Sequence, residues 1–259
     1  MFTTSYLGGG LRRCSEASPR ERVAPAKPAR EQNASEGSGA TMQRHFHEEL
    51  AGLRQTLLAM GGLCEEQIRR VMRALMERDD ALAQEVINRD RQVNAYDVEV
   101  DESCVNLLAL HQPAASDLRF ITTAMKIVTD LERIGDQAVN IAQRALELNR
   151  EPQLKPYIDL PRMAERAQVM VKESLDAFVE RDTDLARRVC AADAEVDALK
   201  EQIFRELLTY MMEDARTIPR AIRLILISRF LERVADHATN IAEMVIYLVE
   251  GKMVRHTLA

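Results

Sequence analysis

Apolar residues recur along most of the chain at intervals of three and four positions, which is the period of an amphipathic α-helix. A representative run is Leu57, Leu58, Leu63, Ile68, Val71 and Leu75. No stretch alternates apolar and polar residues as a strand would, and no hairpin signal separates such stretches. The pattern predicts an all-α protein.

Prolines divide the helical pattern into segments. They stand at Pro113, Pro152, Pro156, Pro161 and Pro219, and a proline ends or begins a helix because it lacks an N–H. We expect six helices, over residues 43–77, 80–110, 116–149, 160–181, 183–213 and 219–249. Asp79 and Asp182 immediately precede two of them, as N-cap residues do.

One segment of the chain occurs twice. Residues 132–142 read ERIGDQAVNIA and residues 232–242 read ERVADHATNIA, so seven of eleven positions are identical. The two predicted N-caps are 103 residues apart, and Asp90 and Asp193 keep that offset. We therefore expect two tandem three-helix bundles related by an internal pseudo-twofold repeat. Their predicted extents are residues 42–151 and 152–251.

The two ends of the chain lack this pattern. Residues 1–41 hold five of the ten glycines and three of the eight prolines, and such a segment cannot bury enough apolar surface to fold alone. We expect a disordered N-terminal tail there and a short C-terminal tail over residues 252–259. Because the helical pattern starts at Met42, a translation start at that residue is an alternative to a real disordered arm.

The distribution of charge limits the partners of the protein. The formal net charge is −6, and residues 1–41 contribute +2, so the remainder carries −8. An acidic body argues against binding to nucleic acid, which requires clustered lysine and arginine. No apolar run is long enough to span a membrane and the start does not resemble a signal peptide, so we expect a cytoplasmic protein. The four cysteines are widely spaced and are expected to be buried free thiols rather than disulfides.

Acidic and amide side chains recur on one side of the repeated segments, at positions i, i+4 and i+8. These residues are Glu132, Asp136 and Asn140 and, in the repeat, Glu232, Asp236 and Asn240. Two pairs at i, i+4 on the preceding helices are Asp97 with Asp101 and Asp197 with Glu201. The second set is not a clean repeat, because the 103-residue offset pairs Asp97 with Lys200.

Oxygen ligands of this kind suit Mg²⁺, Mn²⁺, Ca²⁺ or iron better than a tetrahedral zinc site. The alternative is a solvated face whose carboxylates pair with neighbouring basic groups. Arg133 and Arg233 are then either counter-charges of the carboxylates or surface residues. Gly135 indicates either a close helix approach or room for an ion, and we interpret His237, which aligns with Gln137, as incidental.

The sequence contains none of the common catalytic motifs. Walker A, GxSxG, GxGxxG and HExxH are absent, and so is the Glu-x-x-His pair of di-iron carboxylate proteins. We therefore predict that the protein is not an enzyme.

Four separated motifs resemble the PhoU family of bacterial phosphate-transport regulators. They are residues 112–119 (QPAASDLR), 131–136 (LERIGD), 210–219 (YMMEDARTIP) and 231–236 (LERVAD). The resemblance covers residues 42–251 and implies two three-helix bundles, a cytoplasmic location and a homodimer. It also implies negative regulation of phosphate uptake and of the phosphate-starvation response, by coupling the ATPase of a phosphate ABC importer to a sensor histidine kinase.

The same resemblance implies metal sites on the acidic faces, at Glu132 with Asp136 and at Glu232 with Asp236. The metal would be iron, zinc, magnesium or manganese. The second half departs from the family pattern at Ala235 and Phe230. The leading hypothesis is a non-enzymatic signalling adaptor, the rival is a metal-storage or metal-dependent redox protein, and a helical scaffold without metal is a third option.

Overall fold

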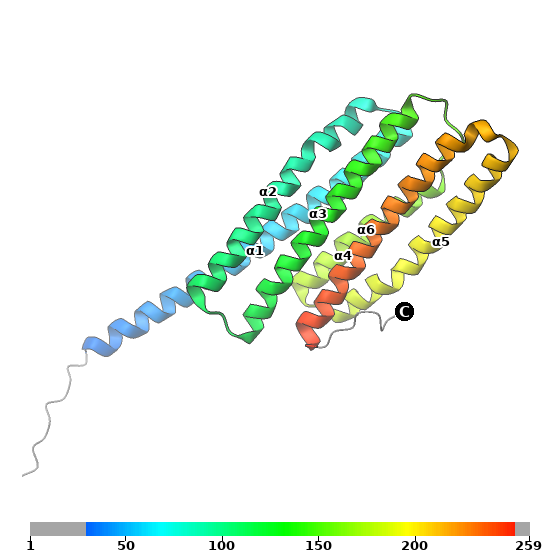
Figure 1. Cartoon of the computed structure of the whole chain (residues 1–259). Coiled ribbons are helices and arrows are strands. Elements are labelled where there is room, and N and C mark those ends of the chain that lie inside the picture. The colour runs from blue at the N-terminus through cyan, green and yellow to red at the C-terminus, as the bar shows by residue number, and fades with distance from the viewer. Residues whose placement is uncertain (1–29, 252–259) are drawn as a thin grey trace, which may run out of the picture. The chain divides into compact units, whose positions relative to one another are not determined.

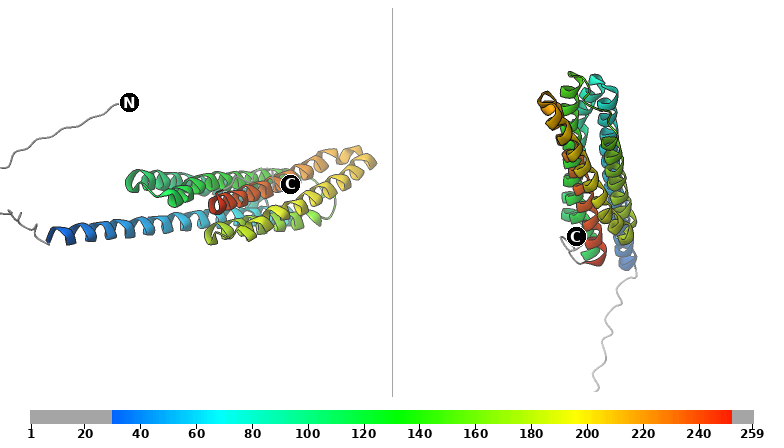
Figure 2. Two further views of the ribbon diagram at one scale, coloured as in Figure 1. Left: turned by 90° about the horizontal axis from the view of Figure 1, so that it is seen from below. Right: turned by 90° about the vertical axis from the view of Figure 1, so that its right-hand side faces the viewer.

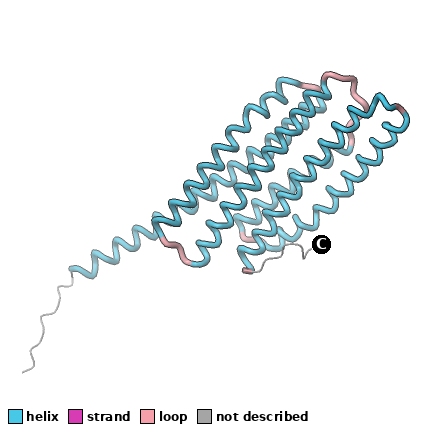
Figure 3. Tube along the Cα trace, in the orientation of Figure 1, coloured by secondary structure: helices cyan, strands magenta, loops and turns pink. Residues whose placement is uncertain are grey.

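The computed structural model describes the backbone of residues 30–251 and the side chains of residues 43–251. This part of the chain contains six α-helices and one short 3₁₀-helix, joined by brief loops (Figures 1 and 3). The elements are α1 (Arg30–Glu77), α2 (Asp80–His111), α3 (Ala115–Asn149), α4 (Asp159–Glu180), α5 (Thr183–Glu213), η1 (Ala215–Thr217) and α6 (Ile218–Glu250).

The predicted helix boundaries are confirmed to within a residue at every end except the start of α1. Both predicted N-caps are present. The carboxylate of Asp79 accepts a hydrogen bond from the Leu82 N–H at 3.0 Å, and that of Asp182 accepts one from the Leu185 N–H at 2.9 Å. Each carboxylate satisfies a backbone donor that has no partner inside its helix.

The first helix is longer than predicted. It begins at Arg30 and so includes residues 30–41, which the sequence pattern assigns to the N-terminal tail. This segment contains no proline, and each of Gly37 and Gly39 weakens a helix by only about 1 kcal/mol relative to alanine. Residues 1–29 and 252–259, which belong to the two predicted tails, lie outside the described residues. The body of the protein begins at Gln43.

Within the body, α1–α3 form one three-helix bundle and α4–α6 form the other, as the repeat predicts. Helix α3 packs against α6, while α2 and α5 lie at the outer edges and α1 and α4 lie behind (Figures 1 and 2). The ring of Phe120 on α3 stacks on that of Phe178 on α4, with centroids 5.0 Å apart. The two repeats therefore share one continuous hydrophobic core.

Polar contacts also join the repeats. The guanidinium of Arg223 on α6 donates to Glu147 at 2.7 Å and to Glu151 at 2.9 Å. Farther along α6, Nδ1 of His237 lies 2.8 Å from Oδ1 of Asp130 on α3. The interpretation of His237 as incidental is therefore wrong. The repeat comparison misses this contact because Phe230 and Gln137 occupy the equivalent positions and cannot form such a pair.

Three of the cysteines lie in the described part, and all three are free thiols. Cys64 and Cys104 are buried as expected, whereas Cys190 is half-buried. The Cys64 thiol donates to the carbonyl of Leu131 at 3.3 Å, and burial raises its pKa to about 12. It is therefore an unreactive packing residue. No helix within residues 30–251 is long and apolar enough to cross a bilayer.

Candidate functional site: two acidic clusters

Helices α2 and α3 bring together four carboxylates, which we call the first acidic cluster. They are Asp90 and Asp97 on α2 and Glu132 and Asp136 on α3. Burial raises the pKa of Glu132, and the negative charges of Asp136, Asp97 and Asp90 raise it further. Mutual repulsion of this kind makes a cluster of anions unfavourable unless a cation neutralises it.

Asp90 is the member of the first acidic cluster whose carboxylate is only partly hydrogen-bonded. Its Oδ2 accepts from the Asn94 amide at 3.3 Å, but its Oδ1 is buried and has no hydrogen-bond partner among residues 43–251. Burial raises its pKa, and the nearby charge of Asp136 raises it further. A buried carboxylate oxygen without a donor is costly, and a hard cation is one group that would satisfy it.

Gly135 explains how α2 and α3 approach each other beside this cluster. A Cβ atom at this position would lie 3.1 Å from Cγ1 of Val93 and 3.5 Å from Oδ1 of Asp90. The equivalent position in the second repeat is Ala235, which is fully buried. The geometry supports the interpretation of Gly135 as a site of close helix approach.

Arg133 lies over the first acidic cluster from its solvent side. Its Nη1 is 3.2 Å from Oδ2 of Asp136 and its Nε is 3.4 Å from Oε2 of Glu132. The side chain is 56% exposed, so these contacts are weakened by water and neutralise the cluster only in part. Arg133 is thus a counter-charge, as one of the two interpretations held, whereas Arg233 forms no ion pair with any described residue.

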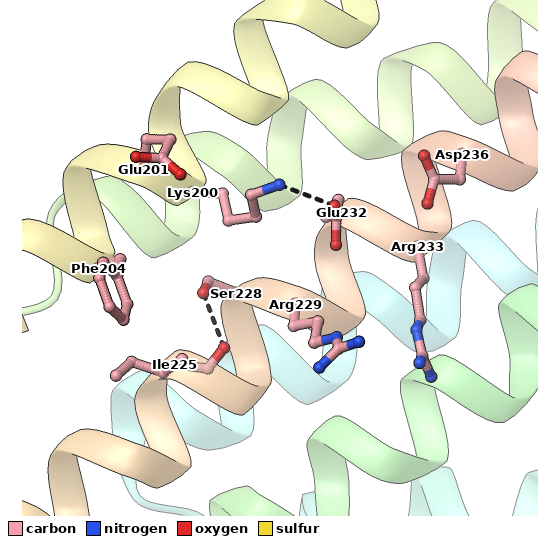
Figure 4. Close-up of a pocket in the computed structure, with 9 residues that line it drawn as sticks. All are labelled: Lys200, Glu201, Phe204, Ile225, Ser228, Arg229, Glu232, Arg233 and Asp236. Carbon is pink, nitrogen blue, oxygen red and sulfur yellow. Dashed lines mark hydrogen bonds and ion pairs between the residues drawn. The ribbon is translucent and has the colours of Figure 1, made fainter.

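Helices α5 and α6 form the second acidic cluster. Its members are Asp193 and Asp197 on α5 and Glu232 and Asp236 on α6. Burial raises the pKa of Asp193 to about 6, together with the charges of Asp236, Asp197 and Glu232 in that order. Unlike the first cluster, this one contains an ammonium group. Nζ of Lys200 donates to Asp197 at 2.8 Å and to Glu232, also at 2.8 Å (Figure 4).

A pocket of about 490 Å³ opens between α5 and α6 next to the second acidic cluster. Lys200 and Glu232 point toward each other across it, and the ring of Phe204 lies at its far end (Figure 4). Arg229 and Arg233 also line it, but they extend away from the Lys200 ammonium (Figure 4). The pocket therefore combines an apolar wall with a charged wall on which Lys200 and Glu232 already pair with each other.

The structure brings six of the ten predicted site residues into the two clusters. They are Asp97, Glu132, Asp136, Asp197, Glu232 and Asp236. Asp101 and Glu201 are exposed at the edges of the clusters. Burial raises the pKa of Asp97, and the negative charge of Asp101 raises it further. Glu201 pairs with Arg205 at 3.5 Å.

The two predicted asparagines do not join the clusters. The Asn240 amide donates instead to Asp130 at 3.3 Å, beside His237 at the contact between repeats. Asn140 has no side-chain hydrogen bond within the described residues. Spacing of i, i+8 leaves these residues about 80° around the helix from the glutamates, and Asn240 thereby reaches Asp130 of the other repeat.

Sequence reasoning missed Asp90 and Asp193 as members of the clusters. The signal was present, because the two aspartates keep the 103-residue offset of α2 and α5. They precede Asp97 and Asp197 by seven and four residues, and both spacings place side chains on the same side of a helix.

The first acidic cluster has the donor chemistry of a site for a hard cation, because its carboxylates repel one another and one of their oxygens has no hydrogen-bond donor in the described part of the chain. Among residues 43–251, however, no three carboxylate, imidazole or thiol side chains already converge as a coordination sphere. Side-chain rotation would have to accompany any binding of metal.

Comparison with known proteins gives one consistent family. A family model described as "PhoU domain" matches residues 57–145 and again residues 160–245. The phosphate-specific transport system accessory protein PhoU homolog of Pseudomonas aeruginosa is 48% identical over 216 residues, which is 83% of this chain and 89% of that protein. The Escherichia coli protein PhoU is 39% identical over 211 residues, covering 82% and 88%.

Solved structures agree with this result. The crystal structure of PhoU from Pseudomonas aeruginosa matches with a TM-score of 0.77 at 48% identity and covers 80% of this chain and 100% of that one. The phosphate transport system regulatory protein PhoU from Streptococcus pneumoniae matches with a TM-score of 0.76 at 33% identity, covering 81% and 99%.

Proposed function

This chain belongs to the PhoU family, and we propose that it is a non-enzymatic regulator of phosphate homeostasis. In this proposal it restrains phosphate uptake and the phosphate-starvation response, by coupling the ATPase of a phosphate ABC importer to a sensor histidine kinase. It acts in the cytoplasm, peripheral to the membrane, and as a homodimer. The observation that carries the proposal is the match of both repeats, over residues 57–145 and 160–245, to one family.

The surface of the two bundles supports an adaptor role. Exposed apolar side chains lie on the outer helices α2 and α5, among them Val98, Val105, Phe204, Leu208 and Met212. Phe204, Leu208 and Met212 follow one another at intervals of four residues and so lie along one side of α5. Contiguous exposed apolar surface of this kind commonly marks a contact with another protein. A partner that binds these helices would leave the shared core of the two repeats undisturbed.

We also propose that the first acidic cluster holds a divalent or trivalent metal ion. Asp90, Asp97, Glu132 and Asp136 would bind it, and the ion would supply the positive charge that these carboxylates lack. Iron, zinc, magnesium and manganese are the candidates, and the all-oxygen donor set favours the harder ions among them. The role of the metal in this proposal is structural, because it fixes α2 against α3.

A clean deletion strain tests the regulatory role. A reporter for phosphate-starvation genes should be expressed at high phosphate when this chain is absent and should be silent again when the wild-type gene is restored. Unchanged reporter expression in the deletion strain would refute the proposal.

The rival metal-storage or redox function predicts a different observation. The purified protein loaded with Fe²⁺ would then consume oxygen or peroxide over many turnovers. We expect only the stoichiometric oxidation of free iron, at the rate of a protein-free control. Sustained turnover that is lost in Glu132→Gln would favour the rival.

A further inference from the structure

Aligning α5 on α2 with the 103-residue offset shows where the two acidic clusters differ. Asp90 corresponds to Asp193, but Asp97 corresponds to Lys200. One turn farther, Asp101 corresponds to Phe204. At two acidic positions of the first repeat, the second repeat therefore has a cation and an aromatic ring.

The Lys200 ammonium lies inside the second acidic cluster rather than over its edge. Its side chain is 29% exposed, compared with 56% for Arg133 at the first cluster. It donates to one carboxylate on each helix, Asp197 on α5 and Glu232 on α6, and so bridges them. A bridge between the two helices is the structural task that a bound ion would perform in the first repeat.

Charge and donor atoms both argue against an ion at this second position. The offset replaces Asp97 by Lys200 and Asn94 by Asp197, so each cluster holds four carboxylates and the second holds an ammonium group as well. A dication entering beside the ammonium would be repelled and would compete for oxygens that Lys200 already uses. Phe204, which aligns with the edge residue Asp101, places an apolar wall beside the site (Figure 4).

We propose that Lys200 is a built-in counter-ion that takes the place of bound metal in the second repeat, so that this chain binds metal in its first repeat only. This inference rests on the metal site of the proposed function. The carboxylates of the first repeat are then neutralised by a metal ion from solution, whereas those of the second repeat are neutralised by the ammonium of Lys200. The concentration of metal would therefore change the stability of the first repeat and not that of the second.

The internal repeat provides reciprocal variants for the test. Lys200→Asp gives the second repeat the residue of the first, and Asp97→Lys gives the first repeat the residue of the second. The full chain is treated with chelator, and its binding of Mn²⁺ is then measured by equilibrium dialysis with elemental analysis, together with the melting temperature with and without Mn²⁺. Arg205→Asp is the matched control, because it makes the same change of charge on an exposed part of α5.

The proposal expects one Mn²⁺ ion per wild-type chain, two for Lys200→Asp, none for Asp97→Lys and one for Arg205→Asp. The double variant Asp97→Lys/Lys200→Asp should again bind one ion, now in the second repeat. Two ions per wild-type chain, or an unchanged count in Lys200→Asp, would overturn it. If the wild type binds none but Lys200→Asp binds one, the counter-ion role of Lys200 stands and the first-repeat metal site fails.

Lys200→Met keeps the inference testable if Lys200→Asp does not fold. This substitution removes the charge and retains most of the apolar stem. We expect a lower melting temperature than the wild type in chelator, with part of the loss recovered in Mn²⁺. A melting temperature equal to that of the wild type, with no response to Mn²⁺, would show that Lys200 is not the counter-ion.

Discussion

At the scale of single residues, Asp193 is the described carboxyl group whose pKa the fold shifts most. Its pKa is raised to about 6 by burial and by the like charges of Asp236, Asp197 and Glu232. The folded state therefore binds more protons than the unfolded chain between about pH 4 and 6. The stability contributed by the protonated group is present below pH 4 and is lost as the pH rises through 6.

Asp193→Asn should remove this dependence. At pH 7 in chelator, the variant should be more stable than the wild type by about 1 kcal/mol, after allowance for solvent screening of a half-exposed group. At pH 4 the two should differ little. Denaturant unfolding across this pH range provides the measurement. Glu195→Gln is the control. Glu195 lies on α5, as Asp193 does, but pairs with Arg166 of α4 at 2.8 Å, so its loss should not stabilise the protein.

The carboxylates of the first acidic cluster permit a second test at this scale. Because metal binds only the folded arrangement, it should stabilise the wild type by about 2.7 kcal/mol at a hundredfold excess over the dissociation constant. Glu132→Gln/Asp136→Asn should abolish that gain, whereas Glu232→Gln/Asp236→Asn should retain it. Thermal melts with and without Mn²⁺ measure both. If chelator leaves the wild-type melting temperature unchanged, the first cluster is an acidic surface and not a metal site.

At the scale of helices, two adjacent glycines of α1 stand in opposite environments. A Cβ atom at Gly61 would collide with the side chain of Leu175 on α4, which is buried in the core. Gly62 has nothing within 4 Å of such an atom. The close packing of α1 on α4 therefore depends on the first glycine and not on the second.

We expect Gly61→Ala to destabilise the protein by about 1–3 kcal/mol, as overpacking of a core does. Gly62→Ala should instead stabilise it by up to about 1 kcal/mol, since alanine is the better helix former. Denaturant unfolding of the two variants provides the comparison, in which each is the control of the other. Equal effects of the two substitutions would show that α1 and α4 are not closely packed at Gly61.

At the scale of the whole molecule, the body that starts at Gln43 is a compact unit of its own. We expect a chain of residues 43–251 to unfold at the same temperature as the full chain. Calorimetry of both proteins tests this. A decrease of several degrees on truncation would show that residues outside 43–251 stabilise the body.

The two repeats should not fold separately, although each is a complete three-helix bundle. Residues 43–151 alone would expose the ring of Phe120, which stacks on Phe178 of the second repeat, and would leave Glu147 and Glu151 without Arg223. We expect this half to lack a cooperative thermal transition by circular dichroism. A sharp transition near that of the full chain would show that the shared core is dispensable.

The sequence alone determines the helical class, the repeat, nearly all helix boundaries and the paired acidic helices. These features depend on interactions among residues a few positions apart, such as the N-cap of Asp79 and the apolar period of each helix. The exception is the start of α1 at Arg30. A polar segment without proline can be either helical or disordered, and its composition alone does not tell which.

Only the tertiary structure decides which side chains from different helices meet. It shows that Asp90 and Asp193 complete the clusters, that Lys200 bridges two carboxylates, and that His237 and Asn240 turn to Asp130. These outcomes depend on how far each helix is rotated about its axis and where it crosses its neighbour. Residues a hundred positions apart set that geometry through packing, and the pattern within any one helix does not contain it.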